Sequence, residues 1–127
     1  MADVNRGNRP LSPHLMIYRP QLTSISSIMV RISGLGVLTL VPLVVWWLLA
    51  AATSEAAFAV IDGFLRSWFG MLILTAAMWG FWYHTLGRLR HVIWDFGYCL
   101  DVPTSEKMGI GMFVGATVLT ALVALVV

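Results

Sequence analysis

Three stretches of this sequence contain no Asp, Glu, Lys or Arg: residues 32–54, 67–87 and 108–127. At about 1.5 Å of rise per residue, a helix over each stretch reaches roughly 30 Å, the thickness of the hydrocarbon core of a bilayer. The chain is 59% hydrophobic and only 11% charged, whereas an ordinary soluble domain has about 25% charged residues. The sequence therefore predicts an all-α membrane protein with three transmembrane helices.

The expected helices run over about 23–53, 61–93 and 105–127, and together they form a single transmembrane domain over 23–127. The preceding residues 1–22 are mostly polar and contain three prolines. A cleaved signal peptide would need an apolar segment close to the N-terminus, and this segment has none. We therefore expect the first apolar helix to stay in the mature protein, as part of a multi-pass protein of a bacterial inner membrane.

The basic residues predict how the helices are oriented. Of the eight Lys and Arg residues, only Arg66 falls on the far side of the expected arrangement, and Asp62, four residues earlier, can pair with it on a helix surface. The other basic residues share one side: Arg6, Arg9, Arg19, Arg31, Arg88, Arg90 and Lys107. The positive-inside rule assigns that side, and with it the N-terminal segment, to the cytoplasm.

The same features disfavour several classes of function. The net charge is +2, but the basic residues lie at membrane ends rather than on one soluble face, so we expect no nucleic-acid partner. A transporter should carry charges near the middle of the bilayer, where these spans have no Asp or Glu. No nucleotide-binding glycine pattern occurs, and no soluble stretch is long enough for a catalytic domain. We therefore assign no catalytic residue to this chain and expect any chemistry to need other subunits.

The segment "HTLGRLRHVIWDFGY", residues 84–98, gathers ionisable groups at the cytoplasmic end of the second span. His84 lies inside the hydrocarbon, where an ionisable residue is a functional candidate. At 100° per residue, Gly80, His84, Gly87 and His91 fall on one stripe of the helix, with Arg88 close to it. The glycines admit another body to the backbone, which is either a neighbouring helix or a flat macrocycle.

A histidine with one free nitrogen in a dry site is suited to ligate haem iron, and a nearby arginine can neutralise the propionates. The alternative is that His84 is hydrogen-bonded across helices and that the glycines serve helix packing only. His84 and His91 are roughly 10 Å apart along one helix. Because axial ligands approach one iron from opposite faces, these two cannot form a pair, and a second ligand would come from another chain.

Two further polar positions lie on the same side of the membrane. Ser27 and Arg31 have i, i+4 spacing, so a hydroxyl and a guanidinium share one helix face and can donate to a carbonyl or a propionate. The alternative is a helix-start residue and a topology anchor. Asp95 follows His91 by four residues and either hydrogen-bonds it or forms an interfacial ion pair that ends the helix.

Three segments, in their order, carry a resemblance to a known family: "RPLSPHLMIYRP", "SSIMVRISG" and "HTLGRLRHVIWDFGY". From about residue 9 to residue 98 the chain resembles the cytochrome b membrane-anchor subunit of succinate dehydrogenase, respiratory complex II. Two positions depart from the family pattern. Val30 stands where a histidine is common, and Arg88 stands where a glycine is usual, with Gly87 one place earlier.

The resemblance implies half of a two-subunit helical bundle that binds haem b. It makes His84 an axial ligand of the haem iron, with the other ligand supplied by the second membrane-anchor subunit. It implies that Ser27 and Arg31 line a ubiquinone site, to which Asp95 is added. Three residues are expected at the haem propionates or in their vicinity: Arg31, Arg88 and His91.

The resemblance also implies partners and a division of labour. The chain would dock a flavoprotein subunit and an iron–sulfur subunit, which oxidise succinate and pass electrons to ubiquinone at the inner membrane face. The sequence does not decide whether such heterotetramers assemble further into a trimer. Two alternatives stay open as well: a purely structural anchor without a cofactor, and the anchor of a menaquinone-linked fumarate reductase.

Overall fold

The computed structural model of the chain describes residue 14 and residues 17–126. Over these residues the chain is helical and has no strand, which confirms the expected all-α class. Its main helices are α3 (Leu22–Thr53), α4 (Glu55–Arg66), α5 (Trp68–Asp95) and α6 (Val102–Val126). Most of the segment expected at residues 1–22 lies outside the described part.

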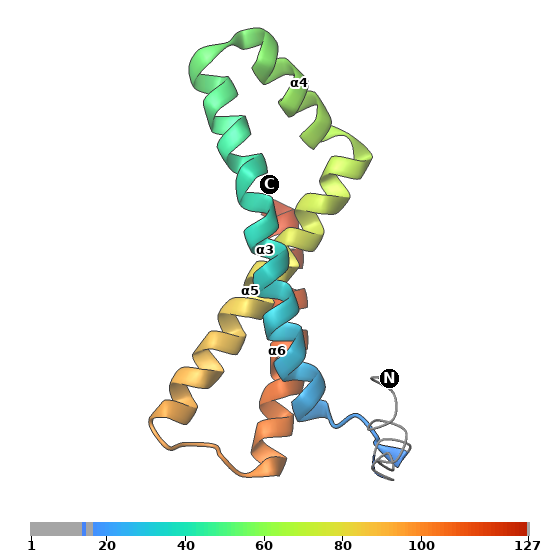
Figure 1. Ribbon diagram of the computed structural model, residues 1–127, viewed down its shortest axis with the longest axis vertical. Coiled ribbons are helices and arrows are strands. Elements are labelled where there is room, and N and C mark those ends of the chain that lie inside the picture. Colours follow the sequence, from blue (N-terminus) through green and yellow to red (C-terminus); the bar gives the residue numbers. More distant parts are fainter. Residues whose placement is uncertain (1–13, 15–16, 127) are drawn as a thin grey trace, which may run out of the picture.

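Figure 1 shows that the beginning of α3, the end of α5 and the beginning of α6 lie at one end of the molecule, and the α3–α4 turn lies at the other. Arg31, Arg88, Arg90 and Lys107 all belong to the first of these ends, which we call the basic end. Arg66 belongs to the opposite end, where its Nε donates to Asp62 Oδ2 across 2.7 Å. The pairing expected from their spacing is therefore present.

Two helices, α3 and α6, are each long and apolar enough to cross a membrane, and α4 and α5 meet this condition only as a pair bent by 73°. The described chain thus has two clear candidate spans, or three if the bent pair counts as one. The sequence predicted one helix over 61–93, and the structure places two helices there. The expected helix was carried across Ser67 on its overall length and apolar composition, which do not indicate a break.

The break lies at Ser67, which has an extended backbone (φ −64°, ψ 158°) and ends α4 while it caps α5. Its Oγ donates to the carbonyl oxygen of Phe64 at 2.6 Å and accepts from the N–H of Gly70 at 3.1 Å. These bonds satisfy backbone groups that a helix end leaves unpaired. A Cβ at Gly70 would lie 2.2 Å from the Phe64 carbonyl oxygen, so only glycine permits so tight a bend.

The start of α6 also differs by a few residues from the expected one. The helix begins at Val102 rather than near residue 105, because Asp101 caps it. The carboxylate of Asp101 accepts a hydrogen bond from the backbone N–H of Thr104 at 3.0 Å. Side-chain capping of this kind satisfies one of the free donors in the first helical turn.

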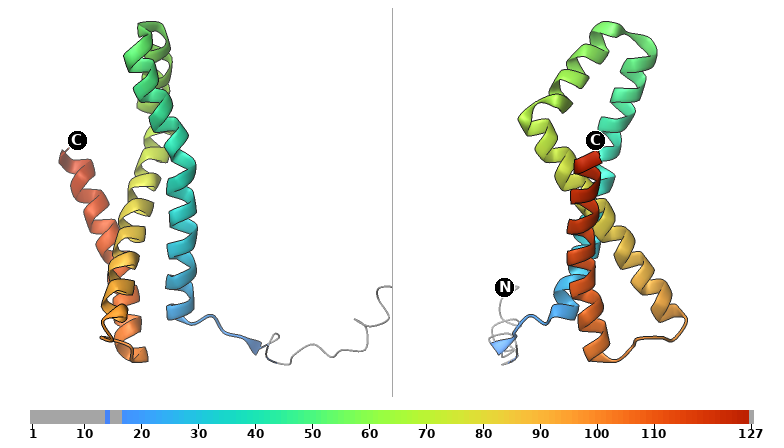
Figure 2. Two further views of the ribbon diagram at one scale, coloured as in Figure 1. Left: turned by 60° about the vertical axis from the view of Figure 1, so that its left-hand side comes forward. Right: turned by 180° about the vertical axis from the view of Figure 1, so that it is seen from behind.

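The core forms where α3, α5 and α6 meet in the half of the bundle toward the basic end. Its buried residues are Val30, Tyr83, Met112 and Ala116. The Tyr83 ring stacks on Trp79, with centroids 5.0 Å apart. Figure 2 shows that α6 ends well before the α3–α4 turn, so the upper parts of α3 and α4 extend beyond it.

Candidate functional site

A groove of about 740 Å³ runs between α3 and α5 at the basic end. It brings together five of the six site residues expected from the sequence: Ser27, Arg31, His84, Arg88 and His91. Its other walls are apolar or small and belong to α3: Val30, Gly34, Leu35 and Leu38. The spacing within each helix explains the arrangement, because residues three, four and seven apart share one helix face.

His84 is held by a hydrogen bond to the neighbouring helix. Its Nδ1 lies 2.9 Å from the backbone carbonyl oxygen of Val30. Because a carbonyl oxygen only accepts, this contact assigns the proton to Nδ1 and leaves the lone pair on Nε2. A metal-binding histidine characteristically has this arrangement, with one ring nitrogen fixed by a carbonyl and the other available as ligand.

Arg88 is the immediate neighbour of that lone pair. Its Nε donates to His84 Nε2 across 3.3 Å. The contact agrees with the tautomer assigned from Val30, since Nε2 can accept only while it carries no proton. A ligand that binds Nε2 must displace this hydrogen bond, and the Arg88 cation then lies beside it, suited to its anionic edge.

The His84 ring lies against the backbone of α3 at Gly34. A Cβ at Gly34 would be 2.5 Å from Cε1 and 2.7 Å from Nδ1 of the ring, closer than real Cβ atoms come. Glycine therefore makes room for the imidazole within reach of the Val30 carbonyl. The sequence did not identify Gly34 in this role, because the position shows its value only when the two helices are placed together.

The two glycines of the predicted α5 stripe face α3. A Cβ at Gly80 would be 3.8 Å from Val37 Cγ2, and one at Gly87 would be 2.4 Å from Val30 Cγ2. The neighbouring helix is therefore close to both glycines, as one of the two expected possibilities requires.

The polar side chains at the rim of the groove differ in their contacts and in their distance from the groove. Within the described residues, the side chains of Ser27 and Arg31 make no hydrogen bond or ion pair, so their donors are open to a ligand. His91 is half-buried, and its ring stands edge-on to Trp94 with centroids 5.1 Å apart. Asp95 is exposed, lies outside the groove lining, and makes no hydrogen bond to His91.

A further charged residue of this region, Arg90, was not predicted as a site residue. Arg90 is only 4% exposed, and its guanidinium lies among α3, α5 and α6 rather than at the groove. The signal was present in the sequence: Tyr83, Gly87 and Arg90 have i, i+4, i+7 spacing, which places Arg90 on the core-facing stripe of α5.

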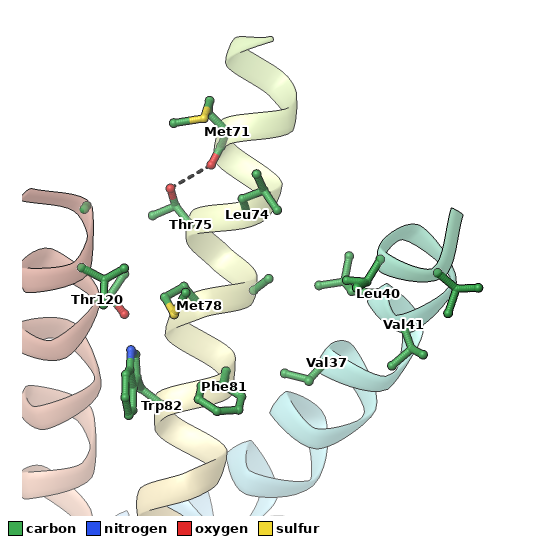
Figure 3. Close-up of a pocket in the computed structure, with 15 residues that line it drawn as sticks. Val37, Leu40, Val41, Met71, Leu74, Thr75, Met78, Phe81, Trp82 and Thr120 are labelled. Carbon is green, nitrogen blue, oxygen red and sulfur yellow. Dashed lines mark hydrogen bonds between the residues drawn. The ribbon is translucent and has the colours of Figure 1, made fainter. Parts of the chain in front are cut away.

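A second groove, of about 830 Å³, lies farther from the basic end and is almost wholly apolar. Figure 3 shows it between α3 and α5, with Thr120 of α6 at one side. Its hydroxyl groups are already bonded within their own helices: Thr75 donates to the Met71 carbonyl at 2.8 Å and Thr120 to the Ala116 carbonyl at 2.7 Å. The remaining polar group of the lining is the indole N–H of Trp82, which is buried and has no hydrogen-bond partner among the described residues.

The first groove can therefore bind a ligand that accepts one nitrogen lone pair and carries anionic or carbonyl groups. The described residues contain no group of three or more His, Cys, Asp or Glu side chains that would hold a bare metal ion. A metal bound through His84 must then bring most of its own ligands, as the iron of a macrocycle does. Apolar walls at Leu35 and Leu38, with cations at Arg31 and Arg88, fit a planar apolar ring with acidic substituents.

Comparisons with known proteins agree with this description. The family described as succinate dehydrogenase/fumarate reductase transmembrane subunit matches residues 5–123. The succinate dehydrogenase cytochrome b556 subunit of Paracoccus denitrificans is 50% identical over 126 residues, which cover 99% of this chain and 97% of that protein. The corresponding subunit of Rickettsia conorii is 32% identical, covering 90% and 89%. A cytochrome b560 subunit of Chondrus crispus is 30% identical, covering 88% and 91%.

Proposed function

This chain belongs to the cytochrome b anchor subunits of succinate dehydrogenase, respiratory complex II, and from this premise we propose that it holds one haem b at His84 and helps to form a ubiquinone-reduction site. The haem would be shared with the second membrane-anchor subunit. One observation supports the proposal above all others. The bond from His84 Nδ1 to the Val30 carbonyl leaves the lone pair of Nε2 in a groove lined by cations.

The residues around His84 have distinct tasks in this proposal. Val30 and Gly34 orient the ring, and the leucines of α3 exclude water from the groove. Arg88 and Arg31 balance the negative charge of the propionates, with His91 at the same rim. Bound haem b supplies reversible one-electron chemistry, whose potential depends on the axial ligands, hydrogen bonds and burial.

A second protein ligand of the haem would come from the second membrane-anchor subunit. His84 and His91 lie on the same face of α5, roughly 10 Å apart along its axis, so they cannot approach one iron from opposite sides. Leu35 and Leu38 of the groove are largely exposed, and a partner helix packed against them would complete the site.

Ser27 and Arg31 are the donors that we assign to ubiquinone. When a quinone is reduced, negative charge develops on its carbonyl oxygens, and a guanidinium and a hydroxyl placed there stabilise it. Asp95 is the remaining proposed contributor. Its exposed position at the end of α5, outside the groove, suits proton exchange with the aqueous side better than direct contact with the ring.

The membrane arrangement follows from the same reading. We propose three spans, with α4 and α5 counted as one bent span, and the basic end at the cytoplasmic face of a bacterial inner membrane. The flavoprotein and iron–sulfur subunits dock at that face. Succinate oxidation belongs to these soluble subunits, and this chain supplies the membrane site where quinone accepts electrons.

The proposal is tested by His84→Ala in the assembled complex, with reduced-minus-oxidised haem spectra of the purified protein. We expect the low-spin haem signal to be lost or replaced by that of a five-coordinate haem. His91→Ala is the matched comparison on the same helix face, and it should retain the axial ligation. An unchanged spectrum in His84→Ala would overturn the ligand assignment. If the purified complex contains menaquinone and reduces fumarate, the chain is instead the anchor of a menaquinone-linked fumarate reductase.

A further inference from the structure

Arg90 is a buried cation without an acidic partner. It is 4% exposed, and within the described residues no carboxylate forms an ion pair with it. Burying an uncompensated charge in a membrane protein is costly, and such residues are retained where they have a specific task. The proposed haem and quinone contacts do not use Arg90, so its task lies elsewhere.

The guanidinium of Arg90 joins all three helices of the bundle. Its Nη1 donates to Ser26 Oγ on α3 across 2.7 Å, and its Nη2 donates to Ser105 Oγ on α6 across 3.1 Å. The carbon centre of the guanidinium lies 4.1 Å from the centroid of the Trp94 ring, which stabilises the cation from one face. Only the planar fork of arginine reaches two acceptors in fixed directions.

Ser26 is held by α5 at two points. Besides the bond from Arg90 to its side chain, its backbone carbonyl oxygen accepts from the hydroxyl of Tyr83 at 3.0 Å. Both contacts are buried. Two attachments on one residue restrict both the rotation of α3 about its axis and its sliding along α5.

The three residues that make these contacts, Ser26, Tyr83 and Arg90, each directly precede a residue of the groove. Tyr83 and Arg90 come before His84 and His91, and Ser26 comes before Ser27. Each residue that joins α3 to α5 is therefore the sequence neighbour of a groove residue, so a shift in these contacts would also shift the groove side chains. A slip of α3 by one residue would move Ser27 by about 1.5 Å along the axis and 100° around it.

We propose that Arg90 is a positioning residue that fixes the register of α3 against α5, and so holds Ser27 and Arg31 opposite His84. The inference rests on the proposed function of the groove, although the register itself does not depend on what the groove binds. The bond from Arg90 to Ser105 holds α6, which contributes no residue to the groove. This bond therefore does not position the groove side chains.

This difference supplies a matched pair of variants. Ser26→Ala and Ser105→Ala each remove one hydrogen bond from the same guanidinium, but only the first loosens the helix that carries groove residues. In the purified full complex we expect Ser26→Ala to raise the KM for ubiquinone about tenfold with a smaller change in kcat, and to alter the haem spectrum. Ser105→Ala should leave both near wild-type values.

Arg90→Lys is a second variant, which retains the charge and loses the fork. It should resemble Ser26→Ala rather than wild type. Wild-type KM and spectrum in both Ser26→Ala and Arg90→Lys would overturn the proposal, and so would equal changes in Ser26→Ala and Ser105→Ala, because these would indicate general loosening of the bundle.

A measurement of the register separates this inference from the proposed function. With Cys99→Ser as background, spin labels at Ile32→Cys on α3 and Leu89→Cys on α5, both at exposed positions, report the distance between the helices by electron paramagnetic resonance. Ser26→Ala should shift or broaden this distance and Ser105→Ala should not. If wild-type complex binds no haem, the proposed function fails, while the distances still decide whether Arg90 sets the register. Unchanged distances in Ser26→Ala overturn the inference alone.

Discussion

The Nδ1 nitrogen of His84 donates a hydrogen bond to the backbone carbonyl oxygen of Val30 across 2.9 Å. The pattern that this chain resembles commonly has a histidine where this chain has Val30. A backbone carbonyl is present whatever the side chain is, so the orientation of His84 does not require that histidine. The Val30 side chain instead lies against Gly87, the residue one place before Arg88, where the pattern has its glycine.

Gly34→Ala should displace the His84 ring. The added Cβ would lie 2.5 Å from Cε1, so the ring must turn away and its bond to Val30 weakens. We expect reduced haem content or a changed haem spectrum in the assembled complex. Gly36→Ala on the same helix is the control, because a Cβ there meets nothing within 4 Å. A wild-type spectrum in Gly34→Ala would refute this role of the glycine.

Gly87→Ala should destabilise the contact between α3 and α5. Its Cβ would lie 2.4 Å from Val30 Cγ2 and 3.1 Å from Cγ1, and such overpacking costs about 1–3 kcal/mol. Val30→Ala removes both methyl groups, so the double variant should lose less stability than the two single losses combined, by at least about 0.5 kcal/mol. Thermal denaturation of the purified complexes measures this coupling. Strictly additive losses would show that the two residues do not limit the approach of the helices.

The first turn of α6 should loosen in acid. The side chain of Thr104, followed by its backbone N–H, lowers the pKa of Asp101 below its ordinary value of 3.8 by hydrogen bonding. A depressed folded-state pKa gives stability that is present above the unfolded pKa and is lost as the pH falls through the folded value. Amide hydrogen exchange over residues 102–106, corrected for its intrinsic pH dependence, should therefore accelerate as the pH falls below about 3.8.

Asp101→Asn is the control for that titration. Asparagine caps helices about as well as aspartate and does not ionise, so the exchange at the start of α6 should respond less to pH in this variant. Because Asp101 is exposed, the effect is confined to the helix start. The same acid response in wild type and Asp101→Asn would show that another group is responsible.

Much of the site was predictable because helical periodicity is local. Spacings of four and seven residues place Ser27 with Arg31, and His84 with Arg88 and His91, on common faces without knowledge of any neighbour. Charge-free length alone indicated α3 and α6 as spans. The break at Ser67 was missed because its cause is a serine followed three residues later by a glycine, a short capping pattern at the start of the charge-free stretch 67–87.

The sequence by itself determined that this chain is helical, enters a membrane, and carries imidazole and guanidinium groups at one end of its spans, because hydropathy and residue spacing act within one helix. Only the tertiary structure decided that Gly34 lies against His84, that a carbonyl of α3 determines which nitrogen of its ring carries the proton, and that Arg90 turns inward to Ser26. These relationships join residues fifty or more positions apart in the sequence. They depend on the rotation and register of one helix against another, which no single helix specifies.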